Sequence, residues 1–409
     1  MAVETNQTAD GRLPLAGFVV IEAGSMIAAS YCGQLLADFG ATVIKVEAPK
    51  GRALDTLRQW GRKYKHGEGF LPSILNRNKQ LVTLDMSVPE GARLFAELLK
   101  RADALVENFK PGILAAWGLG EAQLAALNDK LIHVAISGYG QTGPMANLAA
   151  FGAIAEAMGG MRALIGFEDR PPARLGVSIG DFLAGLYAAF GLTTSLLERQ
   201  KSGKGQLVDV GIYEAVMGVM EDLLPVYTFF NAVRGPVGTG FDRLAPSNIY
   251  ACRDGGWVLI AAPTDGPFRK LARRMGKPEL LDDERFKTQS LRADHRAEID
   301  AIVTQWTKTF DSGELVKLLR TDDIPAGKSY TAADIMVDEH IKAREMVIRA
   351  YDERTGEVPM QGVVPKLSRT PGRVSHAGGA VGRDTEAVYA QLLGLSAEEI
   401  AGLRSRGVI

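Results

Sequence analysis

The sequence predicts an α/β protein with two parts: a large, doubly wound, Rossmann-like domain built on a parallel sheet, and a smaller α+β domain. Two observations lead to this prediction. Short β-branched runs alternate with helical segments over the first half of the chain, and strand, helix and strand within about 30 residues is typical of a right-handed parallel βαβ unit. Around residues 225–248 the sequence becomes rich in proline and glycine, and a hairpin and several helices follow. With 409 residues, the chain is long enough for two or three domains.

The expected elements of the large domain follow one another in a regular order. Strands are predicted at residues 17–23, 41–49, 81–87, 103–109 and 131–140, and helices at 28–40 and 89–102. Pro89 suits the first turn of its helix, because that position needs no backbone N–H donor. This alternation predicts a sheet covered by helices on both faces, and ligands of such sheets bind at the carboxyl ends of the strands.

The second half of the chain changes character. The predicted elements are a strand leading into a helix at 205–224, a hairpin at 249–263, helices at 267–276, 296–310 and 312–322, a β segment at 356–365 and a helix at 396–407. Gly255 and Gly256 lie near the turn of the hairpin, where glycine is common. The elements that follow the proline-rich stretch, to about residue 330, are expected to form the smaller domain.

Composition and charge limit the classes of function. The formal net charge is −1, so no electrostatic field would draw the protein to nucleic acid or to an acidic membrane. We expect no apolar run long enough to span a bilayer, and the polar N-terminus lacks the pattern of a secretory signal. The two cysteines, Cys32 and Cys252, are far apart in sequence, which argues against a disulfide framework or a cysteine zinc site. These features predict a cytoplasmic protein.

Several common catalytic motifs are incomplete in this sequence. The first strand–helix turn has Gly24 and Gly33 but lacks the G-x-G-x-x-G spacing of a dinucleotide site, and the G-x-G-x-x-G at 138–143 precedes Pro144 rather than a clear helix. None of the five histidines has a histidine three or four residues away, so no metal site is expected. The spacing G-x-S-x-G occurs at 176–180, but the polar, proline-containing residues before it do not form the strand that the elbow of serine hydrolases requires. A nicotinamide enzyme and a serine hydrolase are both disfavoured.

Asp181 is the acid with the most informative surroundings. It lies between Gly180 and a long apolar stretch with Phe182, Leu186 and Phe190 on one face, which predicts a helix that is apolar nearly all round and buried. Aspartate is a preferred N-cap residue, and a capping role alone would explain its place. A carboxylate at the start of a helix is also kept ionised by the helix dipole, and in a dry pocket it becomes a good nucleophile. These residues by themselves leave both roles open.

Several blocks of the sequence resemble the class III CoA-transferase family, which includes formyl-CoA transferase and carnitine-CoA transferase. The blocks include "LLADFGATVIKVEAP", "NRNKQLVTLDMSVPEG", "ADALVENFKPGILAAWGLG", "ISGYGQTGP" and "SIGDFLAGLYAAFGLTTSLLERQKSGKGQLVDVGIYEAV". The resemblance runs from about Leu15 to the C-terminus. The nucleophile of this family is the aspartate of a Gly-Asp pair before an apolar helix. Gly180-Asp181 matches that pair, so the resemblance implies that Asp181 is the catalytic nucleophile.

The resemblance also implies a reaction in which coenzyme A moves between carboxylic acids. Asp181 would attack an acyl-CoA to give an aspartyl–acyl anhydride, and an aspartyl-CoA thioester would follow, both shielded from water. Coenzyme A is then a substrate, and neither a permanently bound cofactor nor a metal is expected. The family binds the nucleotide part of CoA along three strand ends. The matching residues here are Met26, Ile27, Leu84, Asp85, Met86, Asn108, Phe109 and Lys110.

The chain departs from the family pattern at two positions that concern the CoA phosphates. Ala48 and Ala116 stand where relatives often have a basic residue. Lys50, Arg52 or Arg58 would have to supply the missing charge.

The similarity is strongest to members of the family that handle short dicarboxylic acids. It favours succinyl-CoA as the donor and an acid such as malate, citramalate, glutarate or itaconate as the acceptor, with Arg162, Arg170 and Arg174 as candidate cations for the acceptor. Two alternatives stay open. One is an acyl-CoA racemase, which needs a histidine where this chain has Phe151 and Gly152, and a phenyl ring cannot carry a proton. The other is a non-catalytic acyl-CoA-binding protein.

Relatives in this family form interlocked homodimers in which the two ends of the chain build one large domain. By resemblance, we expect residues 1–224 and 335–409 to form a large CoA-binding domain, residues 225–334 to form a small one, and the protein to be an interlocked homodimer. Its expected partners are acyl-CoA and carboxylic acids, and not nucleic acid or a membrane.

Overall fold

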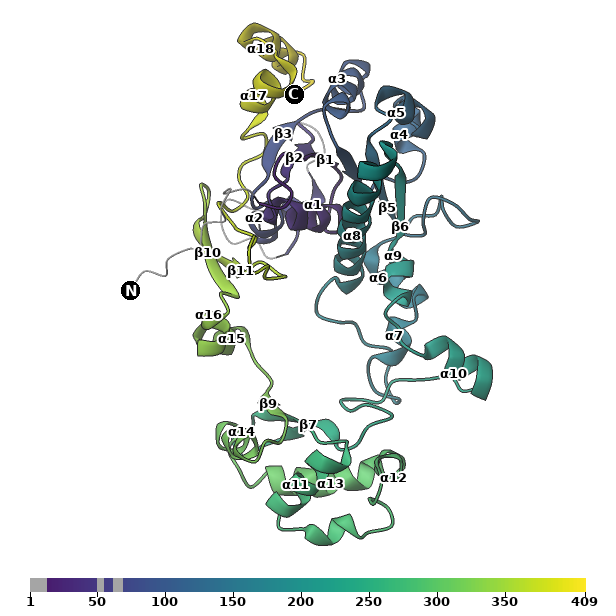
Figure 1. The fold of residues 1–409 in the computed structure, drawn as a ribbon, viewed down its shortest axis with the longest axis vertical. Helices are drawn as coiled ribbons and strands as arrows, with labels where there is room; N and C mark the ends of the chain where they lie inside the picture. The colour runs from purple at the N-terminus through teal and green to yellow at the C-terminus, as the bar shows by residue number, and fades with distance from the viewer. Residues whose placement is uncertain (1–12, 50–54, 62–68) are drawn as a thin grey trace. The chain divides into compact units, whose positions relative to one another are not determined.

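The computed structural model describes residues 13–49, 55–61 and 69–409 of the chain (Figure 1). These residues form two compact units. The first comprises the described residues up to Met161 together with Gly176–Glu221 and His340–Ile409, and the second comprises Arg162–Leu175 and Asp222–Glu339. Each unit has its own sheet and its own hydrophobic core.

A six-stranded sheet in the order β3-β2-β1-β4-β5-β6 forms the centre of the first unit, and all its neighbouring strands are parallel. Its strands are β1 Val19–Ala23, β2 Thr42–Glu47, β3 Gln80–Thr83, β4 Ala104–Glu107, β5 Ile132–Ser137 and β6 Leu207–Gly211. The predicted α/β fold with a parallel sheet is confirmed. The strand order reverses between β1 and β4, and ligands of such sheets bind at the carboxyl ends of strands at this switch point.

Helices pack against both faces of this sheet. They include α1 Ala28–Asp38, α2 Leu71–Leu75, α3 Pro89–Lys100, α4 Ile113–Ala116, α5 Glu121–Leu127, α6 Gly152–Met158, α8 Ile179–Ser202 and α9 Ile212–Met217, with the 3-10 turn η1 Thr56–Gln59. Successive residues of β1 separate the two cores. Val20 packs in the core that contains α1 and α8, whereas Ile21 packs in the core that contains Phe95 of α3. The sheet is therefore buried on both faces, as parallel sheets are.

The C-terminal part of the chain completes the core beside β3. Its elements are α16 Glu339–Ala343, β10 Val347–Asp352, β11 Gly356–Gln361, α17 Thr385–Val388, the π-helical turn η3 Tyr389–Leu393 and α18 Ala397–Ser405. The hydroxyl of Tyr389 donates to the carbonyl of Thr83 at 2.8 Å, and a carboxylate oxygen of Asp384 accepts from the N–H of Leu81 at 2.8 Å. Figure 1 shows α17 and α18 in yellow next to β3 and α3.

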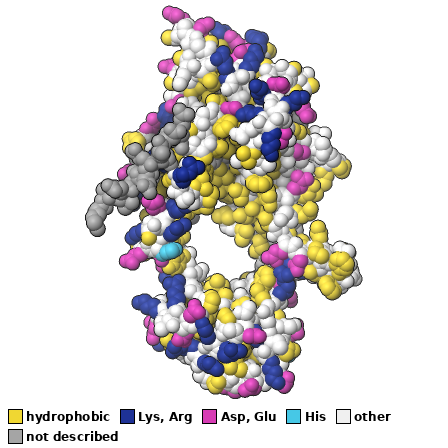
Figure 2. All heavy atoms as spheres, in the orientation of Figure 1, with side chains coloured by type: hydrophobic (Ala, Val, Ile, Leu, Met, Phe, Trp, Pro, Cys, Tyr) yellow, Lys and Arg dark blue, Asp and Glu magenta, His cyan; other side chains and the backbone are white. Residues whose placement is uncertain are grey.

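Helix α8 packs mainly through small residues, together with Leu192 and Leu196, and leaves several large ones exposed. Ala184 and Ala188 are fully buried, and a Cβ on Gly185 would lie 2.6 Å from the carbonyl oxygen of Ala28, so α1 approaches α8 closely. On the other side of the helix, Phe190 is 68% exposed and Leu186 is 50% exposed. The prediction of a helix buried all round is therefore wrong, because the side with Leu186 and Phe190 stays largely exposed within the described part of the chain. Figure 2 shows hydrophobic side chains gathered over the part of the first unit that carries α8.

Helix α8 also contradicts a second expectation from the sequence, which concerns segments long enough to span a membrane. Among the described residues, α8 is the one helix long and apolar enough to cross a membrane, judged by length and composition only. The expectation that no apolar segment reaches that length is thus wrong. Its buried side packs against β5, β6 and α1, as a core helix of a globular protein does.

The second unit is built on a three-stranded antiparallel sheet in the order β7-β8-β9. Its elements are α10 Leu223–Phe230, β7 Ser247–Ala251, β8 Trp257–Ala261, α11 Asp265–Arg274, η2 Pro278–Leu281, α12 Gln289–Asp294, α13 Arg296–Thr307, α14 Ser312–Thr321, β9 Ala326–Lys328 and α15 Ala332–Val337, and α7 Met161–Leu164 lies at its boundary. The predicted hairpin is β7 and β8, with Gly255 at a φ of +76° in its turn. Helices α11, α13 and α14 supply most of the remaining core.

Candidate active site

Asp181 lies in the first turn of α8, three residues after the N-cap Ser178. The helix begins at Ile179, so Asp181 is not its cap, and a capping role alone does not explain this carboxylate. Its position still places it beside the first N–H groups of a 24-residue helix, whose dipole favours the ionised form. The next residue, Phe182, packs edge-to-face on Tyr31 of α1 with ring centroids 4.9 Å apart, which fixes the start of α8 against the first strand–helix turn.

Gly152, the first residue of α6, makes room for the Asp181 carboxylate. A Cβ placed on Gly152 would lie 2.4 Å from Oδ2 of Asp181 and 3.0 Å from its Cγ. Atoms cannot approach so closely, so any side chain at position 152 would have to displace the carboxylate. The start of α6 and the first turn of α8 therefore meet at Asp181.

Phe151 precedes this glycine and is the N-cap residue of α6. Its side chain is 71% exposed. The racemase alternative needs a proton carrier at this point of the chain, and neither Phe151 nor Gly152 has an ionisable group.

The loop after β1 is held in a strained conformation by three side chains from elsewhere in the chain. Met26 has a φ of +65°, a left-handed conformation that is uncommon for a residue with a side chain. The carboxylate of Asp55 accepts from the N–H of Met26 at 3.0 Å, and the side chain of Asn108 bonds both the N–H and the carbonyl of Ser25, at 2.9 and 2.7 Å. The ammonium of Lys45 donates to the carbonyl of Gly24 at 2.6 Å. The shape of this loop is therefore fixed before any ligand arrives.

A buried network of charges supports that loop. Lys45 lies 3.0 Å from Glu22 and 3.1 Å from Asp55, and Lys79 lies 2.6 Å from Glu22. Burial by itself would lower the pKa of Lys45, but the carboxylates of Asp55, Glu22 and Glu47 outweigh burial and raise that pKa above its usual value. Burial would likewise raise the pKa of Asp55, but Lys45 and two backbone N–H donors bring it below its usual value. The shifts of Lys45 and Asp55 both favour the charged forms, whereas burial lowers the pKa of Lys79.

The predicted CoA-binding residues after β3 face different ways. Leu84 and Asp85 are buried, and a carboxylate oxygen of Asp85 accepts from the N–H and the hydroxyl of Ser87. Met86 is half-buried and lines a cavity. Of these three side chains, Met86 is placed to touch a ligand, whereas Leu84 and Asp85 shape the turn.

The predicted residues after β4 also differ in what they can do. The side chain of Asn108 is committed to Ser25 of the β1 loop. Phe109 is half-buried and packs edge-to-face on Trp117, with ring centroids 5.2 Å apart. Lys110 is exposed. Met26 and Ile27 follow β1, so the residues matched to CoA binding all lie at the carboxyl ends of β1, β3 and β4.

Arg58 is buried and paired, so it is not placed to bind a phosphate. Its guanidinium contacts both carboxylate oxygens of Glu47, at 2.6 and 2.7 Å, and donates to the carbonyl of Gly379 at 3.0 Å. The interpretation of Arg58 as a substitute cation for the CoA phosphates is therefore wrong. Lys50 and Arg52 lie outside the described residues.

Arg162, Arg170 and Arg174, the candidate cations for an acceptor acid, lie in the segment Arg162–Leu175 of the second unit. The side chain of Arg170 is exposed and stacks over the ring of Phe167, 5.4 Å from its centroid. Asp181 belongs to the first unit. Which of the three serves an acceptor acid stays a prediction.

Sequence reasoning missed the buried network of Lys45, Lys79, Glu22 and Asp55. A signal for it was present, because Lys45 lies in the middle of the strand "TVIKVE", where a parallel sheet buries both faces. A charge in such a place needs a charged partner. The identity of the partners depends on tertiary structure, and the sequence does not give it.

Comparisons with known proteins identify the family of this chain. The profile of CoA-transferase family III matches residues 15–385. The succinyl-CoA–D-citramalate CoA-transferase of Chloroflexus aurantiacus is 46% identical over 397 residues, covering 97% of this chain and 98% of that protein. The beta subunit of the succinyl-CoA–L-malate CoA-transferase of the same organism is 38% identical, covering 97% and 98%.

A solved structure gives the same result for the fold. The crystal structure of a CAIB/BAIF family protein from Brucella suis superposes with a TM-score of 0.83 at 33% identity, covering 93% of this chain and all of that one. The match extends over nearly the whole chain. This protein is therefore an enzyme that belongs to CoA-transferase family III.

Proposed function

We propose that this enzyme transfers coenzyme A from succinyl-CoA to a short dicarboxylic acid, with Asp181 as the nucleophile. The observation that carries the proposal is the setting of Asp181, in the first turn of α8, with a glycine at position 152 where any side chain would displace the carboxylate. The relatives named above act on succinyl-CoA with D-citramalate or L-malate. Their similarity supports a dicarboxylate as the acceptor.

The first half of the reaction releases the donor acid. A carboxylate oxygen of Asp181 attacks the thioester carbonyl, a C–O bond forms, the C–S bond breaks, and CoA leaves as a thiolate. The product is an aspartyl–succinyl anhydride. The thiolate then attacks the aspartyl carbonyl of that anhydride, which gives an aspartyl-CoA thioester and free succinate. One anion enters and one leaves at each step, so no proton and no ATP is needed.

The second half repeats these steps with the acceptor. Its carboxylate attacks the aspartyl-CoA thioester, releases the thiolate and forms a second anhydride on Asp181. The thiolate attacks the acyl carbonyl of the acceptor, which gives the new acyl-CoA and restores Asp181. Water has to be kept from the anhydrides and the thioester, because each would be hydrolysed.

The loop after β1, which hydrogen bonds from Lys45, Asp55 and Asn108 hold in place, is suited to the recognition of CoA. Met26 and Ile27 lie between the switch point of the sheet and the start of α1, and Ile27 packs in one cluster with Phe182, the residue after Asp181. A ligand along this loop would therefore reach the start of α8. We place the nucleotide part of CoA farther along the same edge, at Leu84–Met86 and Asn108–Lys110, with the side chains of Met86, Phe109 and Lys110 and the neighbouring backbone as contacts.

We further propose that the enzyme works as an interlocked homodimer in the cytoplasm. The exposed apolar side of α8, with Leu186 and Phe190, supports burial against a second copy. For that assembly we keep the expectation of a large domain from residues 1–224 and 335–409 and a small one from 225–334, whereas the compact units differ from it in assigning Arg162–Leu175 to the second unit. The two cysteines are buried and unbridged, which suits a reducing compartment.

The proposal is tested by transfer and by trapping. The purified enzyme is mixed with succinyl-CoA and a panel of dicarboxylic and monocarboxylic acids, and new CoA thioesters are identified by mass spectrometry. Hydroxylamine added with succinyl-CoA should label Asp181. The variant D181A should lose transfer, whereas D129N, a change at an exposed aspartate before β5, should keep it.

Three outcomes count against parts of the proposal. Transfer by D181A at the wild-type rate would exclude Asp181 as the nucleophile. Exchange of the α-proton of an acyl-CoA in D₂O without an acceptor acid would favour a racemase. Tight CoA binding without turnover of any acid would favour a binding protein.

A further inference from the structure

A cavity of about 380 Å³ lies between the start of α3 and the turn that follows α4. It is lined by Met86, Ser87, Val88, Pro89, Ala92, Arg93, Ala96, Ala116, Trp117, Gly118 and Leu119. One wall continues from the strand end that carries Met86, and the other includes Trp117, which packs on Phe109. The cavity is therefore contiguous with the residues to which the CoA nucleotide is assigned above.

Arg93 is the one charged residue in the lining of this cavity. The other side chains of the lining are apolar except for the hydroxyl of Ser87 and the indole N–H of Trp117. A mostly apolar pocket with an indole ring suits a flat heterocycle, and a guanidinium at its rim suits a phosphate. A purine nucleotide with a phosphate on its ribose has both chemical features.

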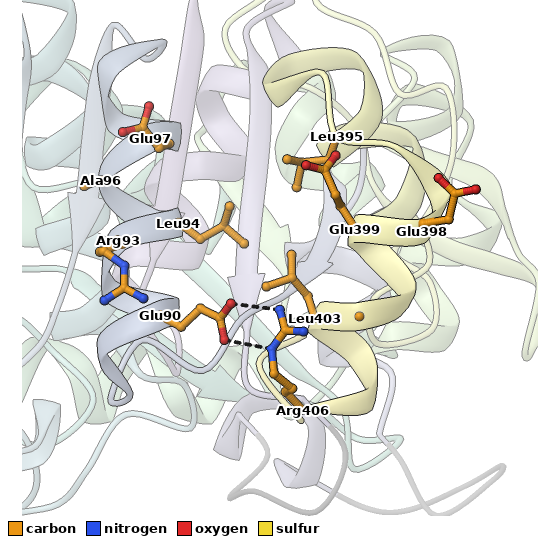
Figure 3. Close-up of a pocket in the computed structure, with 11 residues that line it drawn as sticks. Glu90, Arg93, Leu94, Ala96, Glu97, Leu395, Glu398, Glu399, Leu403 and Arg406 are labelled. Atoms are coloured by element: carbon orange, nitrogen blue, oxygen red, sulfur yellow. Dashed lines mark hydrogen bonds and ion pairs between the residues drawn. The ribbon is translucent and has the colours of Figure 1, made fainter.

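The acidic neighbours of Arg93 on α3 each form an ion pair with another cation. Glu90, one turn earlier, is bound by the guanidinium of Arg406 through two hydrogen bonds of 2.8 and 3.0 Å. Glu97, one turn later, is paired with Lys100. In Figure 3, Glu90 extends from α3 toward Arg406 on α18, and the guanidinium of Arg93 lies away from that pair. Within the described part of the chain, Arg93 forms no ion pair within 4.0 Å, although its charge adds to that of Arg406 in lowering the pKa of Glu90.

The other side of Arg93 is less suited to a phosphate. Arg93 also borders a cavity of about 760 Å³ between α3 and α18 (Figure 3). That cavity is lined by four acidic residues, Glu90, Glu97, Glu398 and Glu399, against two basic ones. A phosphate there would meet like charge, so the cavity beside Ala116 is the better place for an anion.

We propose that Arg93 binds the 3′-phosphate of coenzyme A and that the cavity beside Ala116 holds the adenosine. The inference rests on the proposed function, because it needs a CoA thioester as the substrate. Ala116 lines the same cavity with only a methyl group, and Arg93, on α3, is the one cationic side chain in the lining. The thioester and the 3′-phosphate are at opposite ends of CoA. Asp181 and the cavity likewise belong to helices on opposite faces of the sheet, α8 and α3.

The test compares succinyl-CoA with succinyl-3′-dephospho-CoA, which lacks only the 3′-phosphate. With succinyl-CoA, R93A should raise KM about 10- to 100-fold with kcat unchanged, since a charge-assisted hydrogen bond to the phosphate is lost. With the dephospho substrate, wild type and R93A should have the same KM. The control R101A changes an exposed arginine at the C-cap of the same helix and should behave as wild type with both substrates.

Other results would overturn the inference. An equal loss for R93A with both substrates would show a structural role for Arg93, and unchanged KM values would show no role. If K110A, and not R93A, shows a loss that depends on the 3′-phosphate, Lys110 is the cation. Should the wild type transfer no CoA at all, the proposed function fails. The role of Arg93 is then judged by calorimetric Kd values of the wild type and R93A for CoA and 3′-dephospho-CoA. A weaker affinity of R93A for CoA alone supports the role, and any other pattern overturns it.

Discussion

The substitution G152A separates the activity of this enzyme from its stability. A Cβ at position 152 would lie 2.4 Å from Oδ2 of Asp181, whereas an ordinary contact begins at 3.4 Å, so the carboxylate must move by the difference, 1.0 Å. A misplacement of about 1 Å at a reacting group can cost about 100-fold in rate, or about 2.7 kcal/mol in activation free energy. We therefore expect kcat to fall about 100-fold.

The same substitution should not destabilise the fold. Gly152 begins α6, and alanine is favoured over glycine in helices by up to about 1 kcal/mol. The melting temperature should stay level or rise while kcat falls. The matched control is G313A in the first turn of α14, where an added Cβ meets nothing within 4 Å, and this variant should keep kcat.

The assay is the steady-state rate of CoA transfer, with the melting temperature measured on the same samples. A G152A variant with wild-type kcat and a raised melting temperature would refute the reasoning. It would show that the carboxylate of Asp181 does not need the position described here in order to react.

Three further predictions concern the charge network and α8. The variant K45M removes the buried ammonium that pairs with Glu22 and Asp55. It should lower the free energy of unfolding, measured in urea, by about 3–5 kcal/mol. A loss below about 1 kcal/mol would contradict the stabilising role of the network. The pKa of Asp55 is lowered from 3.8, so its stabilising contribution is complete above pH 3.8 and is lost as the pH falls through the folded-state pKa. The stability of D55N should depend less on pH in that acidic range, and equal slopes for the two proteins would exclude this effect. Finally, F190D places a charge on the exposed apolar side of α8 and should shift a dimer toward monomer in sedimentation, whereas a monomeric wild type would remove the basis of that expectation.

The parallel sheet could be predicted from the sequence because its signals are local. The β-branched run of β1, the helix α1 and the strand β2 lie within 30 residues, and each was expected close to its observed bounds. The apolar pattern around Asp181 likewise predicted a helix. It did not predict which side of α8 is buried, because alanine and phenylalanine both count as apolar, and only packing against α1 distinguishes them.

The roles of individual charges could not be predicted in this way. Arg58 looked like a surface cation, but Glu47 and a carbonyl 321 residues away, that of Gly379, bury it. Arg93 would be read as the solvated side of an amphipathic helix. Its place opposite Ala116 follows from how α3 and α4 are positioned by the sheet, which no pattern within either helix encodes.

The hydrogen bond from Tyr389 to Thr83 joins residues 306 positions apart. A ribosome adds about 5–20 residues per second, so roughly 15–60 seconds separate the synthesis of β3 from that of the segment that covers it. During this interval the nascent chain has an incomplete core beside β3. Its exposed apolar residues can then aggregate or be bound by chaperones. Slower translation of the last third of the message should therefore lower the soluble yield of this enzyme.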